Sequence, residues 1–253
     1  MLNLSKSDLL FLSNFASINE SIHFYPGNRQ SVVSNSGDCF AFANFEEEFP
    51  QEFCLYDLNH FISVYSLVSS TGDTVLKFPK EKQYLEIQSD KTSQDIKFCD
   101  AKLVEELDRT KKYVIEKPDI QFTLTESMLD YGKKAAAING FQHIVFEGDT
   151  KDIYMVAETI PENRQEKHRS ERHRRKIDQP NETGRKFSAV FKVDKLKMLS
   201  DDYTVKIAAK GGASFDSLNR EYTFFAALRE PVQFYDSQTK TRVEEKEYET
   251  VED

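Results

Sequence analysis

The apolar and polar positions of the chain alternate between a helical period and a strand period. Apolar residues recur every three or four positions over Ser5–Ile18, which predicts an amphipathic helix whose N-terminus Ser5 and Asp8 can cap. A second helix is predicted over Tyr56–Val68, with Asp57 as its cap and a wide apolar stripe. Short β-rich runs predict strands between and after these helices: "IHFYPG", "QSVVSN", "CFAFANF", then "DTVLKF", "YLEIQS" and "DIKFCDA".

The second half of the chain repeats this order. The phrase "FASINESIHFYPG" at residues 15–27 returns as "AAAINGFQHIVFEG" at residues 135–148, with small residues, then Ile-Asn, then an apolar run that closes on glycine. We interpret both as a helix, a turn and a strand, and the repeat as a duplicated unit. The predicted elements are a strand "IQFTLT", a helix at residues 126–139, strands "HIVFEG", "DIYMVAET" and "KFSAVFKV", a short helix "DKLKML" at residues 194–199, and strands "YTVKIAAK", "ASFDS" and "REYTFFAAL".

Composition narrows the class of protein. The chain has 253 residues, of which 39% are hydrophobic, so it can bury a sizeable core as one large domain or two of ordinary size. The net charge of −9 argues against attraction of the whole surface to nucleic acid or to anionic membranes, so any nucleic-acid surface must be local. The sequence predicts no signal peptide and no membrane span.

The usual signatures of enzymes and metal sites do not occur in the sequence. There is no GxGxxG, Walker loop, GxSxG or HExxH, and "KGGAS" at Lys210–Ser214 follows a strand without opening a helix, which favours a hairpin turn. The three cysteines lack CxxC spacing and are interpreted as buried thiols. The five histidines are mostly in separate elements. We therefore expect no enzymatic activity, no cofactor and no metal.

Two charged segments interrupt the pattern. The run "RQEKHRSERHRRK" at residues 164–176 carries seven Lys or Arg residues and is predicted to belong to a mobile insertion between two strands, either solvated or in contact with nucleic acid or a partner. The end of the chain, "VEEKEYETVED" at residues 243–253, is acidic and predicted to be disordered.

Three runs carry a resemblance to a known family. "LSKSDLLFLSNFASIN", "YDLNHFISVYSLV" and "YTVKIAAKGGASF" resemble the DNA polymerase sliding clamp, or processivity factor, of T-even-type bacteriophages. The resemblance covers nearly the whole chain in matching order, and "YDLN" followed by "F" and "SLV" is its most specific part. The basic insertion and the acidic C-terminal extension depart from the family pattern.

This resemblance implies an α+β DNA-clamp fold, with two similar domains per chain and two helices packed on antiparallel sheets in each. The implied ring is a homotrimer of six domains. The implied division of the chain is clamp domain 1 at 1–110, an interdomain connector at 111–119, clamp domain 2 at 120–230 with the basic insertion at 161–185, and an acidic tail at 231–253.

The function implied by the resemblance is mechanical. Such a ring encircles duplex DNA without reading its sequence, tethers the replicative DNA polymerase, is loaded by an ATP-driven clamp loader and acts in the cytoplasm of the infected bacterial host. Family members also serve as co-activators of late transcription with RNA polymerase-associated factors. The alternative from another class is a regulatory nucleic-acid-binding protein that uses residues 164–176.

Five lysines are candidates for the DNA-facing channel. Lys6 shares a stripe with Ser13 and Ser17, away from the apolar face of its helix. Lys133 and Lys134 are predicted to lie opposite Met128, Tyr131, Ala135 and Ile138 on their helix. Lys195 and Lys197 flank Leu196. The alternative is that all five are ordinary solvated lysines. The resemblance also implies a hydrophobic pocket for partner tails, which we place near the connector at residues 103–115 without naming its residues. The five candidates are Lys6, Lys133, Lys134, Lys195 and Lys197.

Overall fold

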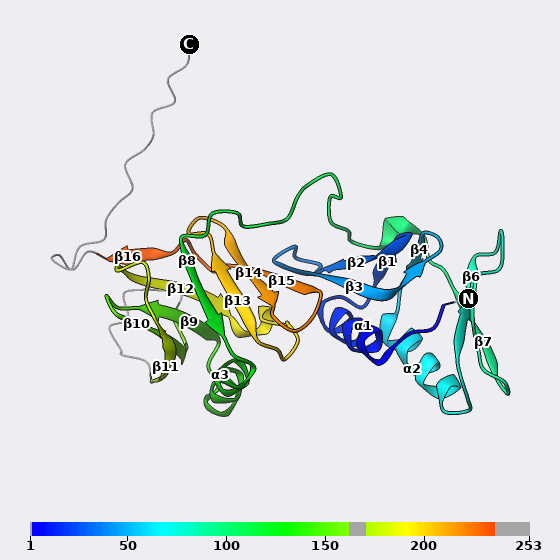
Figure 1. Ribbon diagram of the computed structural model, residues 1–253, viewed down its shortest axis with the longest axis horizontal. Helices are drawn as coiled ribbons and strands as arrows, with labels where there is room; N and C mark the ends of the chain where they lie inside the picture. Colours follow the sequence, from blue (N-terminus) through cyan, green and yellow to red (C-terminus); the bar gives the residue numbers. More distant parts are fainter. Residues whose placement is uncertain (1, 162–170, 236–253) are drawn as a thin grey trace, which may run out of the picture. The chain divides into compact units, whose positions relative to one another are not determined.

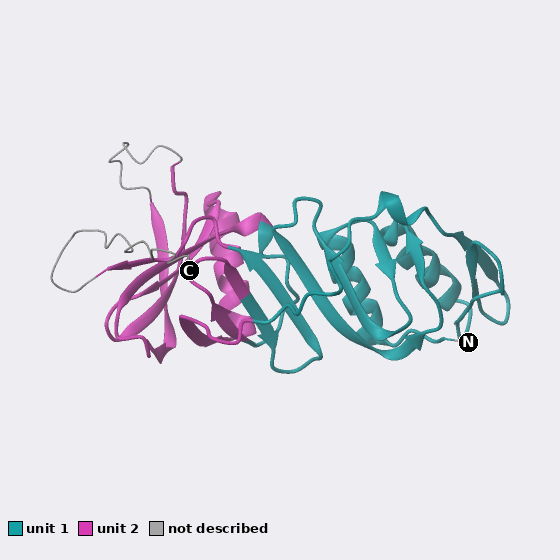
Figure 2. Cartoon of the chain, turned by 90° about the horizontal axis from the view of Figure 1, so that it is seen from above, with its two compact units in different colours: residues 1–114, 195–203, 214–227 teal, residues 115–194, 204–213, 228–253 magenta. Residues whose placement is uncertain are grey.

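The computed structural model of the chain describes residues 2–161 and 171–235. It divides into two compact units, which are coloured separately in Figure 2 and treated separately below. Unit 1 comprises residues 1–114, 195–203 and 214–227, and unit 2 comprises residues 115–194, 204–213 and 228–253. The domain limits expected from the sequence stay a prediction.

The order of elements repeats along the chain (Figure 1). A helix, four strands, a second helical element and three strands occur twice. The helices are α1 (Lys6–Ile18), α2 (Leu58–Ser69) and α3 (Glu126–Asn139), with 3-10 turns η1 (Ala101–Leu103) and η2 (Val193–Lys195). The strands are β1 (Ile22–Phe24), β2 (Gly27–Val33), β3 (Cys39–Phe49), β4 (Phe53–Leu55), β5 (Val75–Lys77), β6 (Tyr84–Gln88), β7 (Ser93–Lys97), β8 (Ile120–Leu124), β9 (His143–Gly148), β10 (Asp152–Glu158), β11 (Arg172–Pro180), β12 (Lys186–Lys192), β13 (Tyr203–Ile207), β14 (Gly212–Ser217), β15 (Tyr222–Ala227) and β16 (Gln233–Tyr235).

Strand β3 is the centre of unit 1. It pairs antiparallel with β2 on one side and with β15 on the other. Its residues alternate between a buried face and a partly exposed face up to Phe45, which is the period of a strand with one side on the core. The buried face continues into a row of phenylalanine rings whose centroids lie 4.7 to 6.2 Å apart: Phe15, Phe45, Phe49, Phe24 and Phe53.

The helices of unit 1 lie side by side against this core (Figure 1). Helix α1 begins with a capping box, in which the backbone N–H of Asp8 donates to Ser5 Oγ (3.1 Å) and the N–H of Ser5 donates to Asp8 Oδ2 (2.9 Å). The fully buried Asp8 also accepts the N–H of Glu46 (3.0 Å) and so attaches the helix to β3. Asp57 caps α2 through the N–H of His60.

A small antiparallel sheet, β5-β6-β7, completes unit 1. Leu2 bridges Leu76 on the outer side of β5 with two backbone hydrogen bonds. Strand β7 lies at the other end of the sheet order, and among the described residues no strand pairs with its outer edge. The connector segment, which we define as residues 104–114, follows this sheet without helix or strand.

Unit 2 is built on a five-stranded sheet in the order β11-β10-β9-β12-β16. Its central strand β9 is buried on both faces, and the valine side chains of β9, β10 and β12 pack into one cluster of Val145, Val156 and Val190. Helix α3 packs against β9, β10 and β11, and strands β8 and β13 are neighbours in a second sheet. In the described part of the chain, no helix is long and apolar enough to cross a membrane.

Both copies of the repeated phrase fold as a helix followed by a strand, as predicted. Helix α1 ends at Ile18, and Asn19 caps it in an extended conformation, with its amide donating to Val33 O (2.8 Å). Helix α3 instead ends with Gly140 in the left-handed region at φ 67°. The same phrase therefore uses two different C-terminal caps.

Two predictions about elements are wrong. Residues 194–199 form no α-helix, because only the 3-10 turn η2 is present and the next residues run without helical bonds. The backbone oxygen of Lys197 instead accepts the Asn14 amide of α1 (2.6 Å). The basic insertion is also not simply a loop, since residues 172–180 form strand β11. Residues 162–170 of the insertion lie outside the described residues. The tail predicted at 231–253 is described only at 231–235, where strand β16 pairs with β12, and residues 236–253 lie outside the described residues.

Gly148 gives a test of the packing in unit 2. A Cβ at this position would overlap with the ring of Phe187, which is 2% exposed, so Gly148→Ala should lower the free energy of unfolding by about 1–3 kcal/mol. Urea denaturation measures the change. Gly211→Ala is the matched control, because nothing lies within 4 Å of its added Cβ, and equal stability of the two variants would contradict this packing.

Candidate nucleic-acid interface

The helical surface of unit 1 carries almost no charge. Lys6 is exposed at the first turn of α1 and makes no hydrogen bond or ion pair with any described residue. Helix α2 contains no Asp, Glu, Lys or Arg, and its exposed side chains include Asn59, Ser63 and Leu67. Phosphate attraction on this surface therefore depends on one lysine.

Several serine hydroxyls of these helices already donate to backbone carbonyls. Ser13 and Ser17 are exposed on α1 as predicted, but they donate to the carbonyls of Leu9 (2.8 Å) and Asn14 (2.6 Å). On α2, Ser63 donates in the same way to Asn59 O (2.8 Å). A hydroxyl has one proton, and here that proton already bonds to a carbonyl. In this conformation these hydroxyl groups therefore cannot donate a hydrogen bond to a phosphate.

Helix α3 buries Met128 and Ala135 of the predicted apolar face, but not the other two predicted residues. Its buried stripe is Met128, Leu129, Gly132, Ala135 and Ala136, with Gly132 against Met155 of β10. Small side chains let the helix approach the sheet closely, and this rotates the two larger predicted apolar residues outward. Tyr131 is 39% exposed and Ile138 83% exposed.

The α3 lysines differ in environment. Lys134 is exposed and has no hydrogen bond or ion pair with described residues. Lys133 is half-buried, and burial lowers the pKa of its ammonium group, partly offset by Asp130. Of this pair, Lys134 is the one whose charge is available at the surface.

Lys195 and Lys197 lie in unit 1 and are held there. Lys195 Nζ is 2.8 Å from Asp38 Oδ2 and 3.2 Å from Ser36 Oγ. Lys197 Nζ donates to Ser17 O (2.6 Å) at the end of α1. Burial alone would raise the pKa of Asp38, but hydrogen bonds from Lys195, Ser36 and Ser34 outweigh it and lower the pKa to about 2.

The even-numbered basic residues of β11 are neutralised on its sheet. The Arg174 guanidinium also lies 3.4 Å from the centroid of the Tyr154 ring. Burial raises the pKa of Glu158, although Arg172 opposes this. The ion pairs are Arg172 with Glu147 and with Glu158 (Nε to Oε2, 3.2 Å), Arg174 with Glu147 (4.0 Å) and Lys176 with Asp152 (2.9 Å).

The odd-numbered residues of β11 point toward α3 instead. His173 Nε2 lies 2.8 Å from the hydroxyl of Tyr131, and the Arg175 guanidinium lies 4.4 Å from the centroid of the same ring. Arg175 is exposed and forms no ion pair within the described residues. The structure thus brings Arg175 to α3, the helix that bears Lys134. Sequence reasoning did not find this position of Arg175, although the alternation of residues along β11 was the available signal.

A second surface of interest lies in unit 1, where the connector segment meets the sheet. Tyr113 packs against Phe40 (5.1 Å between ring centroids) and Phe42 (5.7 Å), and Phe225 stacks on Phe40 (4.6 Å). Arg29 lies over Phe42 at 4.7 Å. Phe40 and Phe42 are the partly exposed residues in the alternation "CFAFANF", so the sequence contained the signal for this aromatic surface.

The fold is that of DNA clamps. The PCNA of A. fulgidus, solved with the C-terminal region of FEN-1, superposes with a TM-score of 0.60 at 13% identity, covering 89% of this chain and 95% of that one. The prediction of an α+β clamp fold with antiparallel sheets is confirmed. The second helix of the second repeat is the exception, since η2 replaces it.

The curated relatives are phage proteins. The sliding clamp of Vibrio phage KVP40 is 28% identical over 222 residues, covering 87% of this chain and 97% of the relative. The sliding clamp of Escherichia phage RB69 is 39% identical over 72 residues, covering 28% of this chain and 32% of the relative. No protein-family model matches the chain. The chain is thus similar to a phage sliding clamp over most of its length, and the resemblance seen in its sequence is confirmed.

The Asp38–Lys195 pair gives a pH prediction. Because the folded pKa lies below the ordinary value of 3.8, the pair stabilises the fold above about pH 4 and loses this effect as the pH falls toward 2. Asp38→Asn should therefore cost about 1 kcal/mol at neutral pH, and this cost should shrink as the pH falls to about 2. Urea midpoints across this range test it, with the exposed Asp73→Asn as control; a constant difference would contradict the assignment.

Proposed function

We propose that this chain is the subunit of a sliding clamp, a non-catalytic ring that encircles duplex DNA and tethers the replicative DNA polymerase. The observation that carries the proposal is the coverage of 97% of the KVP40 sliding clamp by a chain with a DNA-clamp fold. The twice-repeated order of elements supports it, because each repeat supplies one segment of a ring.

The proposed ring is a homotrimer with domains near 1–110 and 120–230. Two exposed sheet edges support it: β7 ends the small sheet of unit 1, and β11 ends the large sheet of unit 2. Within the described ranges, neither outer edge is paired, and an open edge is a template for another strand. Pairing of β7 in one copy with β11 in the next is head-to-tail, which is the contact that closes a ring.

The five predicted lysines remain our proposed DNA-facing residues, and their contacts rank them. Lys6 and Lys134 come first because both are exposed and uncommitted among the described residues. Arg175 joins them through its position beside α3. Lys133, Lys195 and Lys197 act mainly in the structure of the helical layer, since burial or local bonds hold them.

The aromatic surface of Phe40, Phe42 and Tyr113, which packs on the buried ring of Phe225, is the proposed site for the tail of the polymerase. Partly exposed rings beside an arginine suit a peptide with aromatic and apolar anchors. The A. fulgidus relative was solved with a C-terminal peptide region of a partner, which is consistent with tail recognition. An ATP-driven loader and late-transcription factors would use the same class of tail.

The alternative of a regulator that binds nucleic acid through residues 164–176 has less support. Arg172, Arg174 and Lys176 are ion-paired on the sheet of unit 2, so their charges are largely balanced. A binder of this kind would depend on electrostatic contacts and weaken steeply with salt. A test of whether the protein encircles DNA therefore distinguishes the clamp from the regulator.

Light scattering should report three chain masses. One chain is 29.3 kDa, so the trimer is about 88 kDa. Measurement at several micromolar, with and without DNA, tests this. Particles of one or two chain masses under both conditions would contradict the closed trimer.

Loaded onto a nicked circular plasmid by its cognate loader and ATP, the protein should stay bound through gel filtration in high salt. A ring held by topology is insensitive to screening, whereas electrostatic contacts fade. One cut in the circle should release it, because a ring slides off a free end. Retention after linearisation with unblocked ends would overturn the clamp proposal.

The double reversal Lys6→Glu and Lys134→Glu should reduce processive synthesis several-fold and leave the trimer mass unchanged, because two phosphate contacts become repulsive. Lys82→Glu with Lys151→Glu is the charge-matched control, since both residues are exposed in turns. Equal loss of processivity in the two double variants would show that net charge, and not position, is responsible.

A further inference from the structure

We propose that His23 is a positioning residue that holds the connector segment against unit 1 while its ring is protonated and releases it as the ring loses its proton. The consequence for partner binding rests on the proposed function, because the connector carries Tyr113 of the aromatic surface. The holding of the connector itself stands on geometry alone.

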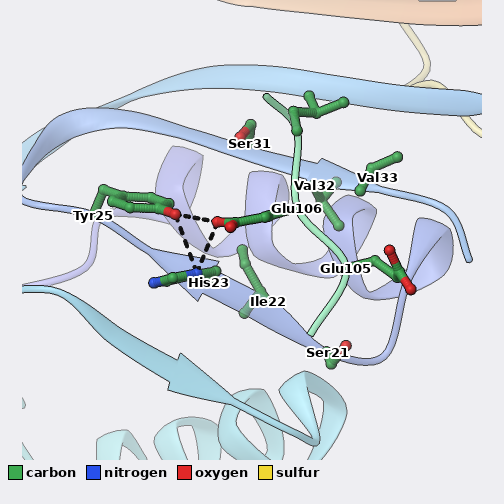
Figure 3. A pocket seen from close by; sticks show the side chains of 10 residues that line it. Ser21, Ile22, His23, Tyr25, Ser31, Val32, Val33, Glu105 and Glu106 are labelled. Atoms are coloured by element: carbon green, nitrogen blue, oxygen red, sulfur yellow. Dashed lines mark hydrogen bonds and ion pairs between the residues drawn. The ribbon is translucent and has the colours of Figure 1, made fainter. Parts of the chain in front are cut away.

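His23 lies between two carboxylates. It is 7% exposed in β1, and its Nε2 is 2.8 Å from Glu52 Oε1. On the other side of the ring, Nδ1 is 3.1 Å from Glu106 Oε2 and 3.2 Å from the hydroxyl of Tyr25 (Figure 3). Glu52 precedes β4, whereas Glu106 belongs to the connector segment, so the ring joins the connector to the body of unit 1.

This arrangement is complete only with a proton on both ring nitrogens. A carboxylate can only accept, so both contacts of His23 require an N–H donor, and a neutral imidazole has one. With the proton on Nε2 for Glu52, the bare Nδ1 and Glu106 would compete for the single hydroxyl proton of Tyr25. Loss of the ring proton therefore removes the ion pair between His23 and Glu106 of the connector.

The neighbouring hydroxyl and thiol groups are neutral. Burial and the hydrogen bond to Glu106 raise the pKa of Tyr25, so this hydroxyl stays a donor. Burial and negative neighbours raise the pKa of Cys54, which faces His23 across the β1–β4 pair, to about 12, and burial raises that of Cys99, so both thiols are neutral. Among the described residues, the charges that act on Cys54 or Tyr25 include Glu52, Glu106 and Asp100, and the cation Arg109, whose guanidinium lies 3.7 Å from the centroid of the Tyr25 ring.

The connector depends on such contacts because it has no helix or strand. Glu106 and Arg109 attach its first half to His23 and Tyr25, and Tyr113 attaches its second half to Phe40 and Phe42. Histidine is the side chain that changes charge between about pH 5 and 8. A rise in pH through this range should therefore loosen the first half of the connector and leave the sheet of unit 1 unchanged.

Amide hydrogen exchange in the free protein tests this directly. After correction for intrinsic exchange rates, residues 104–112 should open about three- to tenfold more at pH 8 than at pH 6, as expected for the loss of one partly exposed ion pair. Strand β3 should show no such change. Equal opening of the connector at both pH values would overturn the proposal.

Two variants and one control assign the effect. His23→Gln should exchange at pH 6 as the natural chain does at pH 8 and lose the pH dependence, and Glu106→Gln should do the same by removing the charge on the connector. His60→Gln, at an exposed histidine of α2, should keep the natural pH dependence. Unchanged pH dependence in Glu106→Gln would overturn the proposal even if His23→Gln failed to fold.

The experiment contains neither DNA nor partner, so its outcome is independent of the plasmid test. A connector that does not respond to pH leaves the clamp proposal intact. If the protein stays bound to the linearised plasmid, the clamp proposal fails, but the proposed role of His23 is unaffected.

Discussion

The side-chain amide of Asn14 is the interaction on which unit 1 depends. Its Nδ2 donates to Lys197 O (2.6 Å), and its Oδ1 accepts the hydroxyl of Tyr222 (2.7 Å), so one residue of α1 binds two segments that lie more than 180 positions later in the chain. The amide is 8% exposed, and a buried polar group must find partners or destabilise the fold. Asn14 therefore fixes where residues 195–203 and 214–227 can pack, and burial of the Tyr222 ring against Phe11 follows from it.

The same packing explains the weak charge of the helical surface. Lys195 and Lys197 bond to Asp38 and to the end of α1, and serine hydroxyls bond to carbonyls of their own helices. Few charges remain to hold phosphates tightly. In the proposed ring, retention by closure and weak contact with DNA are compatible, because strong ion pairs would slow movement and depend on salt.

The two surfaces proposed for partners differ in how they are held. The Arg175–Tyr131–His173 cluster joins a strand to a helix, so its geometry is fixed by regular structure. The aromatic surface around Phe42 depends on a connector without helix or strand, fastened at His23. The first surface suits contact with a uniform phosphate backbone, and the second suits regulation, because a segment held by a few polar bonds opens at small cost.

The sequence by itself determined the repeated order of elements, the capped helices α1 and α2, the alternation of β3 and the resemblance to phage clamps, because these depend on local periodicity and on residue identities. Tertiary structure decided the rest. Residues 194–199 carry a helical pattern, but their backbone bonds to α1 instead; β11 forms because β10 offers it a pairing edge; and α3 turns Tyr131 outward because Gly132 lets the helix sit close to Met155. The contacts of Lys195, Arg175 and His23 are with residues distant in sequence, and no local pattern specifies which distant residue a side chain will meet.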